Sequence, residues 1–209
     1  MNLNDKRVHL LQIAETLFSA KGYEGTSVRD IAEEAGVNIA MISYYFGSKE
    51  KLMQALFEQR TTEIKLRVES ILQDNTLEPL QKVNMLIEEQ VERVMRDQQF
   101  QKIMICEQII NKNPVILDVL KDLKVRNAKL IAELIKDGQK KGAFKKKVDV
   151  VLLLSTMFGT VMQLMINPSF YRDYNNLGDM TEMDFQKHLK TKVTNHIKNI
   201  FKALLINES

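Results

Sequence analysis

The segment from Thr26 to Lys49 contains residue types and spacings suited to binding nucleic acid. It reads TSVRDIAEEAGVNIAMISYYFGSK. A helix-turn-helix needs two short helices joined by a tight turn, which commonly contains glycine, and Gly36 supplies the backbone freedom for that turn. The small residues Ala32 and Ala35 let the two helices approach closely. The segment therefore predicts a helix-turn-helix.

The second helix of this motif, about residues 39–46, is predicted to turn a small, polar and aromatic face outward. At about 100° per residue, a helical wheel with Ile42 as the buried centre places Ala40, Ser43 and Tyr44 on the opposite side. A face of this kind can enter the major groove of DNA. An ordinary solvent-exposed face of a helical hairpin has the same spacing, so the spacing alone leaves both interpretations open.

Motifs for catalysis, phosphate binding and metal binding are missing from the sequence. We find no G-x-S-x-G, no H-E-x-x-H, no phosphate loop and no glycine-rich dinucleotide turn. His9, His188 and His196 are isolated, and the single cysteine, Cys106, has no partner for an intrachain disulfide or a metal-binding pair. We therefore expect no catalytic residues, no metal and no cofactor.

The lone cysteine and the N-terminus favour a cytoplasmic protein. Charged residues such as Asp5 and Lys6 interrupt the N-terminal segment, which therefore lacks the apolar core of a signal peptide. Residues 150–166 carry no charge, but the run is shorter than the roughly 20 residues of a membrane-spanning helix and includes polar residues. A helix buried in a core or a subunit interface explains this run better than a membrane span.

Hydrophobic periodicity predicts an all-α chain of about nine helices and no strand. Glycine and proline are scarce, with 8 and 3 residues, which agrees with long helices and few turns. Residues 167–180 are predicted to be a loop. The predicted helices cover about residues 5–20, 26–35, 39–46, 49–72, 79–96, 100–111, 114–141, 148–166 and 182–206.

Residues 10–52 resemble the tetracycline-repressor-like (TetR) family of bacterial regulators. They read LLQIAETLFSAKGYEGTSVRDIAEEAGVNIAMISYYFGSKEKL and cover about a fifth of the chain. A looser match lies between residues 137 and 160, where a Gly-x-x-x-Gly-x-Phe pattern precedes an apolar helix. The resemblance implies a three-helix helix-turn-helix DNA-binding domain in residues 1–47 and a helical effector-binding and dimerisation domain in residues 48–209.

The resemblance also implies DNA-contact roles for particular residues. Thr26 would bind phosphate through its hydroxyl and backbone N–H, and Tyr45 and Lys49 would contact phosphate as well. Arg29 would reach phosphate or a nearby base, with a helix-surface ion pair as the alternative. Five residues of the second motif helix would face the groove: Asn38, Ile39, Ala40, Ser43 and Tyr44.

Two features of the sequence weigh against strong DNA binding by this segment. Ile39 and Met41 are less polar than is usual for the family, so apolar contact with thymine methyl groups or readout of DNA shape would have to compensate. Residues 1–60 contain slightly more acidic than basic side chains. DNA affinity would then come from well-placed cations, helix N-termini and two copies of the module.

Dimerisation is predicted through the last two long helices. Helix 148–166 is too apolar to be exposed, and Gly159 and Thr160 would let a partner helix come close. With helix 182–206, and the same pair from a second subunit, it would form a four-helix bundle. The alternative is a helix buried inside a monomer. The predicted apolar stripe of the last helix is Phe185, Leu189, Val193, Ile200 and Leu204.

The remaining helices are predicted to enclose a pocket for a small, mostly apolar effector of unknown identity. Flexible thioethers and aromatic rings suit such a site, although the same residues also serve as ordinary core or surface. The candidates are Met95, Phe100, Met104, Met157, Phe158, Met162, Tyr171 and Tyr174.

The sequence as a whole predicts a DNA-binding transcriptional regulator, of the repressor type, that acts as a homodimer on a palindromic operator. The effector would release it or otherwise modulate it. The alternative is a helical interaction or ligand-sensing module that no longer binds DNA.

Overall fold

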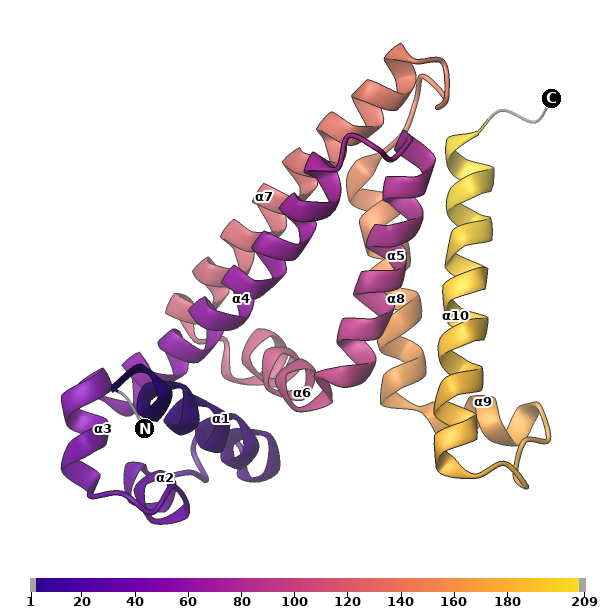
Figure 1. Ribbon diagram of the computed structural model, residues 1–209. Helices are drawn as coiled ribbons and strands as arrows, with labels where there is room; N and C mark the ends of the chain where they lie inside the picture. The colour runs from indigo at the N-terminus through magenta and orange to yellow at the C-terminus, as the bar shows by residue number, and fades with distance from the viewer. Residues whose placement is uncertain (1–2, 207–209) are drawn as a thin grey trace. The chain divides into compact units, whose positions relative to one another are not determined.

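The computed structural model describes residues 3–206, and every regular element in that range is a helix (Figure 1). The all-α prediction is confirmed. The elements are α1 (Leu3–Lys21), α2 (Val28–Glu34), α3 (Ile39–Phe46), α4 (Lys49–Gln73), α5 (Pro79–Arg96), α6 (Gln98–Cys106), the π-helical turn η1 (Glu107–Asn111), α7 (Pro114–Lys140), α8 (Val150–Ile166), α9 (Pro168–Tyr174) and α10 (Glu182–Leu205).

The predicted loop at residues 167–180 is wrong, because it contains α9. Asn167 is the N-cap of this helix, and its side chain accepts a hydrogen bond from the backbone N–H of Phe170 at 3.4 Å. Pro168 follows at the first helical position, where its missing N–H costs nothing. About nine helices were therefore too few for the described part of the chain.

The chain folds into two compact units. Unit 1 consists of the residues up to Leu66 together with Asp97–Lys124, and unit 2 consists of Arg67–Arg96 and the residues from Val125 onward. The long helices α4 and α7 each contribute one part to each unit. The predicted boundary between a DNA-binding domain and an effector-binding domain at residues 47 and 48 stays a prediction.

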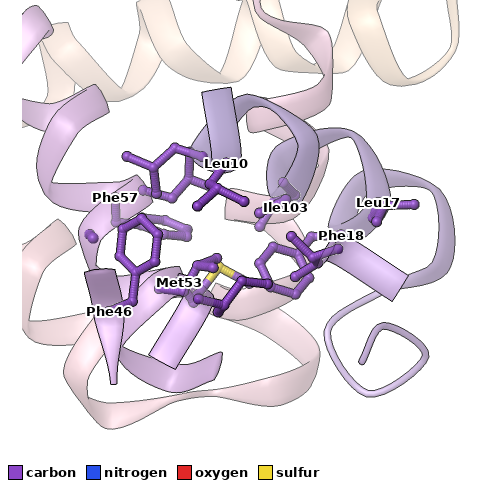
Figure 2. Packing of buried hydrophobic residues seen from close by; sticks show 14 of the residues in the cluster. Leu10, Leu17, Phe18, Phe46, Met53, Phe57 and Ile103 are labelled. Carbon is purple, nitrogen blue, oxygen red and sulfur yellow. The ribbon is translucent and has the colours of Figure 1, made fainter. Parts of the chain in front are cut away.

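Unit 1 has a core built from α1, α2, α3, the first part of α4 and α6, and the first turns of α7. Figure 2 shows side chains from these helices pointing toward one another. Phe57 has no exposed surface, and its ring centroid lies 5.0 Å from that of Phe100. Full burial of each such side chain stabilises the fold by roughly 1.5–3 kcal/mol. The labelled members of the cluster are Leu10, Leu17, Phe18, Phe46, Met53, Phe57 and Ile103.

Unit 2 has its own core, in which α5, α8 and α10 lie side by side (Figure 1). The buried stripe of α10 repeats every four residues and packs against α5 and α8. It begins as predicted but continues through other residues than Ile200 and Leu204. Its members are Phe185, Leu189, Val193, Ile197, Phe201 and Leu205.

Gly138 and Phe144 account for part of the looser family-like pattern in unit 2. Phe144 is buried, and its ring lies directly against the backbone of α7 at Gly138. A Cβ atom at position 138 would lie 2.1 Å from Cδ2 of Phe144. Glycine is therefore the residue that permits this close approach.

Within residues 3–206, no individual helix combines the length and apolarity needed to cross a membrane, whereas α8 and α9, which meet at a bend of 79°, pass that test only as a pair.

Candidate nucleic-acid interface

The start of α2 is fixed by a complete capping box. The Ser27 hydroxyl oxygen accepts a hydrogen bond from the backbone N–H of Asp30 at 3.1 Å. In return, Oδ2 of Asp30 accepts one from the backbone N–H of Ser27 at 2.8 Å. The two hydrogen bonds satisfy donors that a helix N-terminus leaves free. Both partners lie within four residues of each other, so the start of α2 is set by the local sequence.

The turn between α2 and α3 is also set by its own residues. Gly36 has a φ of 64°, a left-handed conformation that glycine adopts without steric cost. Val37 then donates its backbone N–H to the carbonyl of Ala32 at 2.9 Å. Asn38 caps α3, because its side-chain oxygen accepts from the backbone N–H of Ala40 at 2.9 Å. The predicted helix-turn-helix is therefore present.

One side of α3 is anchored in the core of unit 1. Ile42 and Phe46 are buried, as are Ile31 and Ala32 on the facing helix α2. Because these residues fill the junction, the rotation of α3 about its axis is fixed, and so is the choice of residues that point outward.

The outward side of α3 carries the residues predicted to face a DNA groove. Tyr44 is 71% exposed and Ile39 is 43% exposed, and Ala40, Ser43 and Asn38 are exposed as well. Arg29 is exposed on α2. The exposure that groove binding requires is present, and the DNA contacts themselves stay predictions.

Tyr45 lies beside Tyr44 but points partly inward. The two ring centroids are 5.2 Å apart in an edge-on arrangement. The hydroxyl group of Tyr45 is buried and makes no hydrogen bond with the described residues. Contact of this hydroxyl with phosphate, as the resemblance implies, stays a prediction.

Thr26 and Lys49 hold the motif together from inside. Thr26 is buried, and its hydroxyl donates to the carbonyl of Gly22 at 2.8 Å. The ammonium group of Lys49 donates to the carbonyl oxygens of Tyr23 at 3.0 Å and Thr26 at 3.1 Å. Phosphate binding by either side chain, as the resemblance implies, would compete with these internal bonds.

An ion pair that sequence reasoning missed ties α1 to α4. Arg60 donates from Nε to Oε2 of Glu15 at 3.0 Å and from Nη2 to Oε1 at 2.9 Å. Glu15 is buried, and burial raises the pKa of its carboxyl group although Arg60 acts in the opposite direction. The two residues are far apart in sequence, so no local pattern could have revealed the pair.

The residues predicted to bind an effector fall in both units. Phe100 is buried in the core of unit 1, and Met104 packs against that core. In unit 2, Met157 is buried, and Met95, Met162 and Tyr171 pack against the same core. Phe158 and Tyr174 are 37% and 78% exposed. The core and surface positions do not by themselves identify an effector site, so all eight stay predictions.

Helix α8 has an exposed apolar stripe on the side opposite its buried residues. Val151, Leu152 and Ile166 are each about two-thirds exposed. Phe158 lies on the same stripe, and an added Cβ at the neighbouring Gly159 would meet nothing within 4 Å. The predicted dimer surface on this helix stays a prediction.

Comparison with known proteins points to one family. Residues 10–56 match the model for bacterial regulatory proteins of the tetR family. Over 50 residues the chain is 50% identical to the probable HTH-type transcriptional regulator YttP of Bacillus subtilis, a match that spans 24% of each protein. It is 25% identical over 150 residues to the HTH-type transcriptional repressor KstR2 of Mycolicibacterium smegmatis, covering 71% of this chain and 72% of that one.

Solved structures share the fold over nearly the whole chain. The ketosteroid transcriptional regulator KstR2 of Mycobacterium tuberculosis has a TM-score of 0.71 at 22% identity, covering 99% of this chain and 98% of that one. The regulator FadR of Bacillus subtilis, solved in complex with stearoyl-CoA, has a TM-score of 0.66 at 19% identity, covering 91% and 96%.

Proposed function

The chain belongs to the tetR family of DNA-binding transcriptional regulators, and we propose that it represses transcription as a homodimer that binds a palindromic operator and is released by a small, mostly apolar effector. The family consists of regulators rather than enzymes, in line with the absence of catalytic motifs from the sequence. The proposal concerns the dimer, the operator and the effector.

The observation that carries the proposal is the outward face of α3. Tyr44, Ser43 and Ala40 are exposed on a helix whose opposite side is fixed by buried residues. A helix held in this way can enter a major groove without rearrangement, and it presents a hydroxyl, a phenol and a methyl group to the base edges. Ile39 adds an apolar side chain suited to a thymine methyl group.

A second copy of the chain supplies the affinity that one copy lacks. Helix-turn-helix dimers place their recognition helices about 34–36 Å apart, one turn of DNA. The exposed stripe of α8 supports dimerisation, because its apolar residues gain from burial. The open space at Gly159 lets a partner helix pack closely. Most of the predicted α10 stripe is buried inside unit 2, so α10 would contribute the member of that stripe that stays half-exposed, Leu204.

The effector is proposed to act on unit 2. The structurally similar FadR was solved with stearoyl-CoA, a ligand with a long apolar chain, and this supports an apolar effector here. Effector binding would favour a conformation in which α4 tilts, so that the two recognition helices no longer fit successive grooves. A coupling free energy of about 1–3 kcal/mol would change DNA affinity by about 5–150-fold.

Selection of bound fragments from random and genomic DNA tests the proposal. We expect a palindrome whose half-sites lie about one helical turn apart, and an affinity that falls steeply with salt concentration. Tyr44→Ala should weaken binding to the selected site strongly. The matched variant Phe170→Ala removes a comparably exposed aromatic ring from α9 and should leave that affinity unchanged.

Two results would contradict the proposal. Failure to enrich any sequence would favour the alternative, a helical interaction or ligand-sensing module that no longer binds DNA. Equal binding by the Tyr44→Ala variant would remove α3 from the interface.

A further inference from the structure

Arg126, on the part of α7 that belongs to unit 2, is a half-buried residue, and two of its three guanidinium nitrogens are buried without a partner. Its Nε and Nη2 atoms are both buried and form no hydrogen bond with the described residues. Arginine stays protonated at any ordinary pH, so this is a partly buried charge with two unsatisfied donors. Such a group destabilises a fold unless something binds it.

Other buried charges in the described chain have partners. Glu15 accepts from Arg60, and the buried Glu107 accepts from Nδ2 of Asn111 at 2.7 Å. Arg126 therefore stands apart from the pattern of the molecule. Its Nε and Nη2 donors have no such partner among the described residues.

Two more polar groups of unit 2 are unsatisfied in the same way. Gln90, on α5, is only 6% exposed, and its Nε2 donor has no partner, although its Oε1 accepts from Arg93. Asn127, next to Arg126 on α7, has a buried Oδ1 atom without a partner. The open groups of Arg126 and Gln90 are donors, which suit an acceptor-rich ligand, and the open group of Asn127 is an acceptor.

The two free nitrogens of Arg126 are the pair that binds a carboxylate or phosphate in a bidentate manner. Nε and Nη2 point to the same side of the planar guanidinium, and they match the spacing of two anionic oxygens. The chain already contains this geometry, because Arg60 binds the carboxylate of Glu15 through its own Nε and Nη2. The two unpaired N–H groups of Arg126 can therefore bind two oxygens of one anion.

We propose that Arg126 binds the anionic group of the effector, and that the effector is an acidic amphiphile with an aliphatic body. This inference deepens the proposed function and rests on it, since it takes unit 2 as the effector-binding unit. The anionic oxygens have two possible sources, a free carboxylate at the end of an acyl chain or the phosphates of its coenzyme A thioester. Both present the same chemistry to the guanidinium.

Calorimetry and thermal unfolding of the full chain test the proposal with three probes that share a 12-carbon chain: dodecanoate, lauroyl-CoA and the uncharged dodecan-1-ol. We expect at least one anionic probe to bind and to raise the Tm of the wild-type chain, and we expect dodecan-1-ol to bind more weakly. Binding of dodecanoate assigns the carboxylate as the source. Binding of lauroyl-CoA alone assigns the phosphates.

Variants of α7 show whether Arg126 is responsible. Arg126→Met should weaken binding of the anionic probe between about tenfold and a hundredfold, and it should keep or raise the Tm of the free chain because two buried donors without partners are removed. Arg126→Lys keeps the charge but loses the fork, so its affinity should be intermediate. Lys129→Met removes one charge from an exposed position of the same helix and should leave probe affinity unchanged.

Three results would overturn the inference. These are no binding of either anionic probe, equal binding of dodecan-1-ol, and undiminished binding by both Arg126 variants. A lower Tm of Arg126→Met with unchanged probe affinity would assign Arg126 a structural role. Binding of the wild-type chain to its selected DNA is measured without any probe, so a failure of the proposed function is seen separately from a failure of this inference.

Discussion

Lys49 reaches back to Tyr23 in two ways at once. Its ammonium nitrogen lies 4.0 Å from the centroid of the Tyr23 ring and 3.0 Å from the carbonyl oxygen of the same residue. A third contact, to the carbonyl of Thr26, completes the set. The cation at the start of α4 is thus used to hold the turn that precedes α2, where the family resemblance implies contact with phosphate.

Replacing Lys49 by methionine separates these two roles. We expect the free energy of unfolding to fall by about 1–3 kcal/mol, because two partly buried carbonyl groups lose a charged donor. The slope of log affinity for DNA against log salt concentration should stay the same. The exposed Lys51→Met is the control for the loss of one charge. A slope smaller by about one, with unchanged stability, would instead identify Lys49 as a phosphate contact.

Asp30 gives the motif a dependence on pH in the acid range. The hydrogen bonds from the backbone and hydroxyl of Ser27 hold the pKa of Asp30 below its ordinary value of 3.8. A lowered folded-state pKa means that the stabilisation is present above pH 3.8 and is lost as the pH falls through the folded-state value. The Tm advantage of the wild type over Asp30→Asn should therefore shrink between pH 5 and pH 3.

The measurement for Asp30 is a series of thermal unfolding curves at closely spaced pH values. Glu33→Gln removes an exposed carboxylate of the same helix that takes no part in the capping box, and it controls for net charge. A Tm difference between wild type and Asp30→Asn that widens on acidification would contradict the prediction.

The Glu15–Arg60 pair should show strong coupling in a double-mutant cycle. Arg60→Met leaves a buried carboxylate unpaired and should cost about 3 kcal/mol of unfolding free energy. The added change Glu15→Leu should restore much of that loss, because both charges are then gone. Burial already raises the pKa of Glu15, and the folded-state stabilisation of a group with a raised pKa is lost as the pH rises. The cost of Arg60→Met should therefore be larger at pH 7 than near pH 4.5.

Denaturant titration of the wild type, the two single variants and the double variant measures the four free energies of unfolding. Additive effects of the two substitutions would show that the pair contributes nothing beyond its separate members.

Gly159 offers a direct test of the proposed dimer surface. In the described chain the space next to this residue is open, so Gly159→Leu should not disturb the fold of unit 2. If α8 packs against a second copy there, the added side chain should raise the dimer dissociation constant on the order of tenfold or more, through steric conflict in a close-packed interface. Sedimentation velocity over a range of concentrations measures it.

Gly178→Leu is the matched control for Gly159, because an added side chain meets open space there as well. It should leave dimerisation unchanged. Equal self-association of both variants would place the subunit interface away from this part of α8.

Features set by neighbouring residues were predictable from the sequence. The capping serine and asparagine of the motif, the end of α1 near Gly22 and the start of α5 at Pro79 all follow from local hydrogen bonding and proline geometry. The missed helix α9 carries the same kind of signal. Asn167 and Pro168 precede and begin it, as Asn113 and Pro114 do for α7. That helix was overlooked because seven residues are too few for periodicity to show.

Features that depend on distant residues were not predictable. The internal bonds of Lys49 and the pairing of Glu15 with Arg60 join positions that only the tertiary fold brings together. The same holds for Arg126, whose missing partner becomes visible only once its surroundings are known. The α10 stripe was predicted to pass through Ile200, but it passes through the adjacent Phe201. A helical repeat read from sequence does not say which of two adjacent apolar residues faces the core.

The contact between Phe144 and the backbone at Gly138 imposes an order on how this part of the chain can change during evolution. While the ring is in place, any side chain at position 138 collides with it. A lineage must therefore first replace the aromatic residue by a smaller one, and only then can position 138 diversify. Among descendants of such a chain, an aromatic residue at 144 beside a glycine at 138 and a small residue at 144 beside anything at 138 should both occur, while the combination of two large residues should be absent.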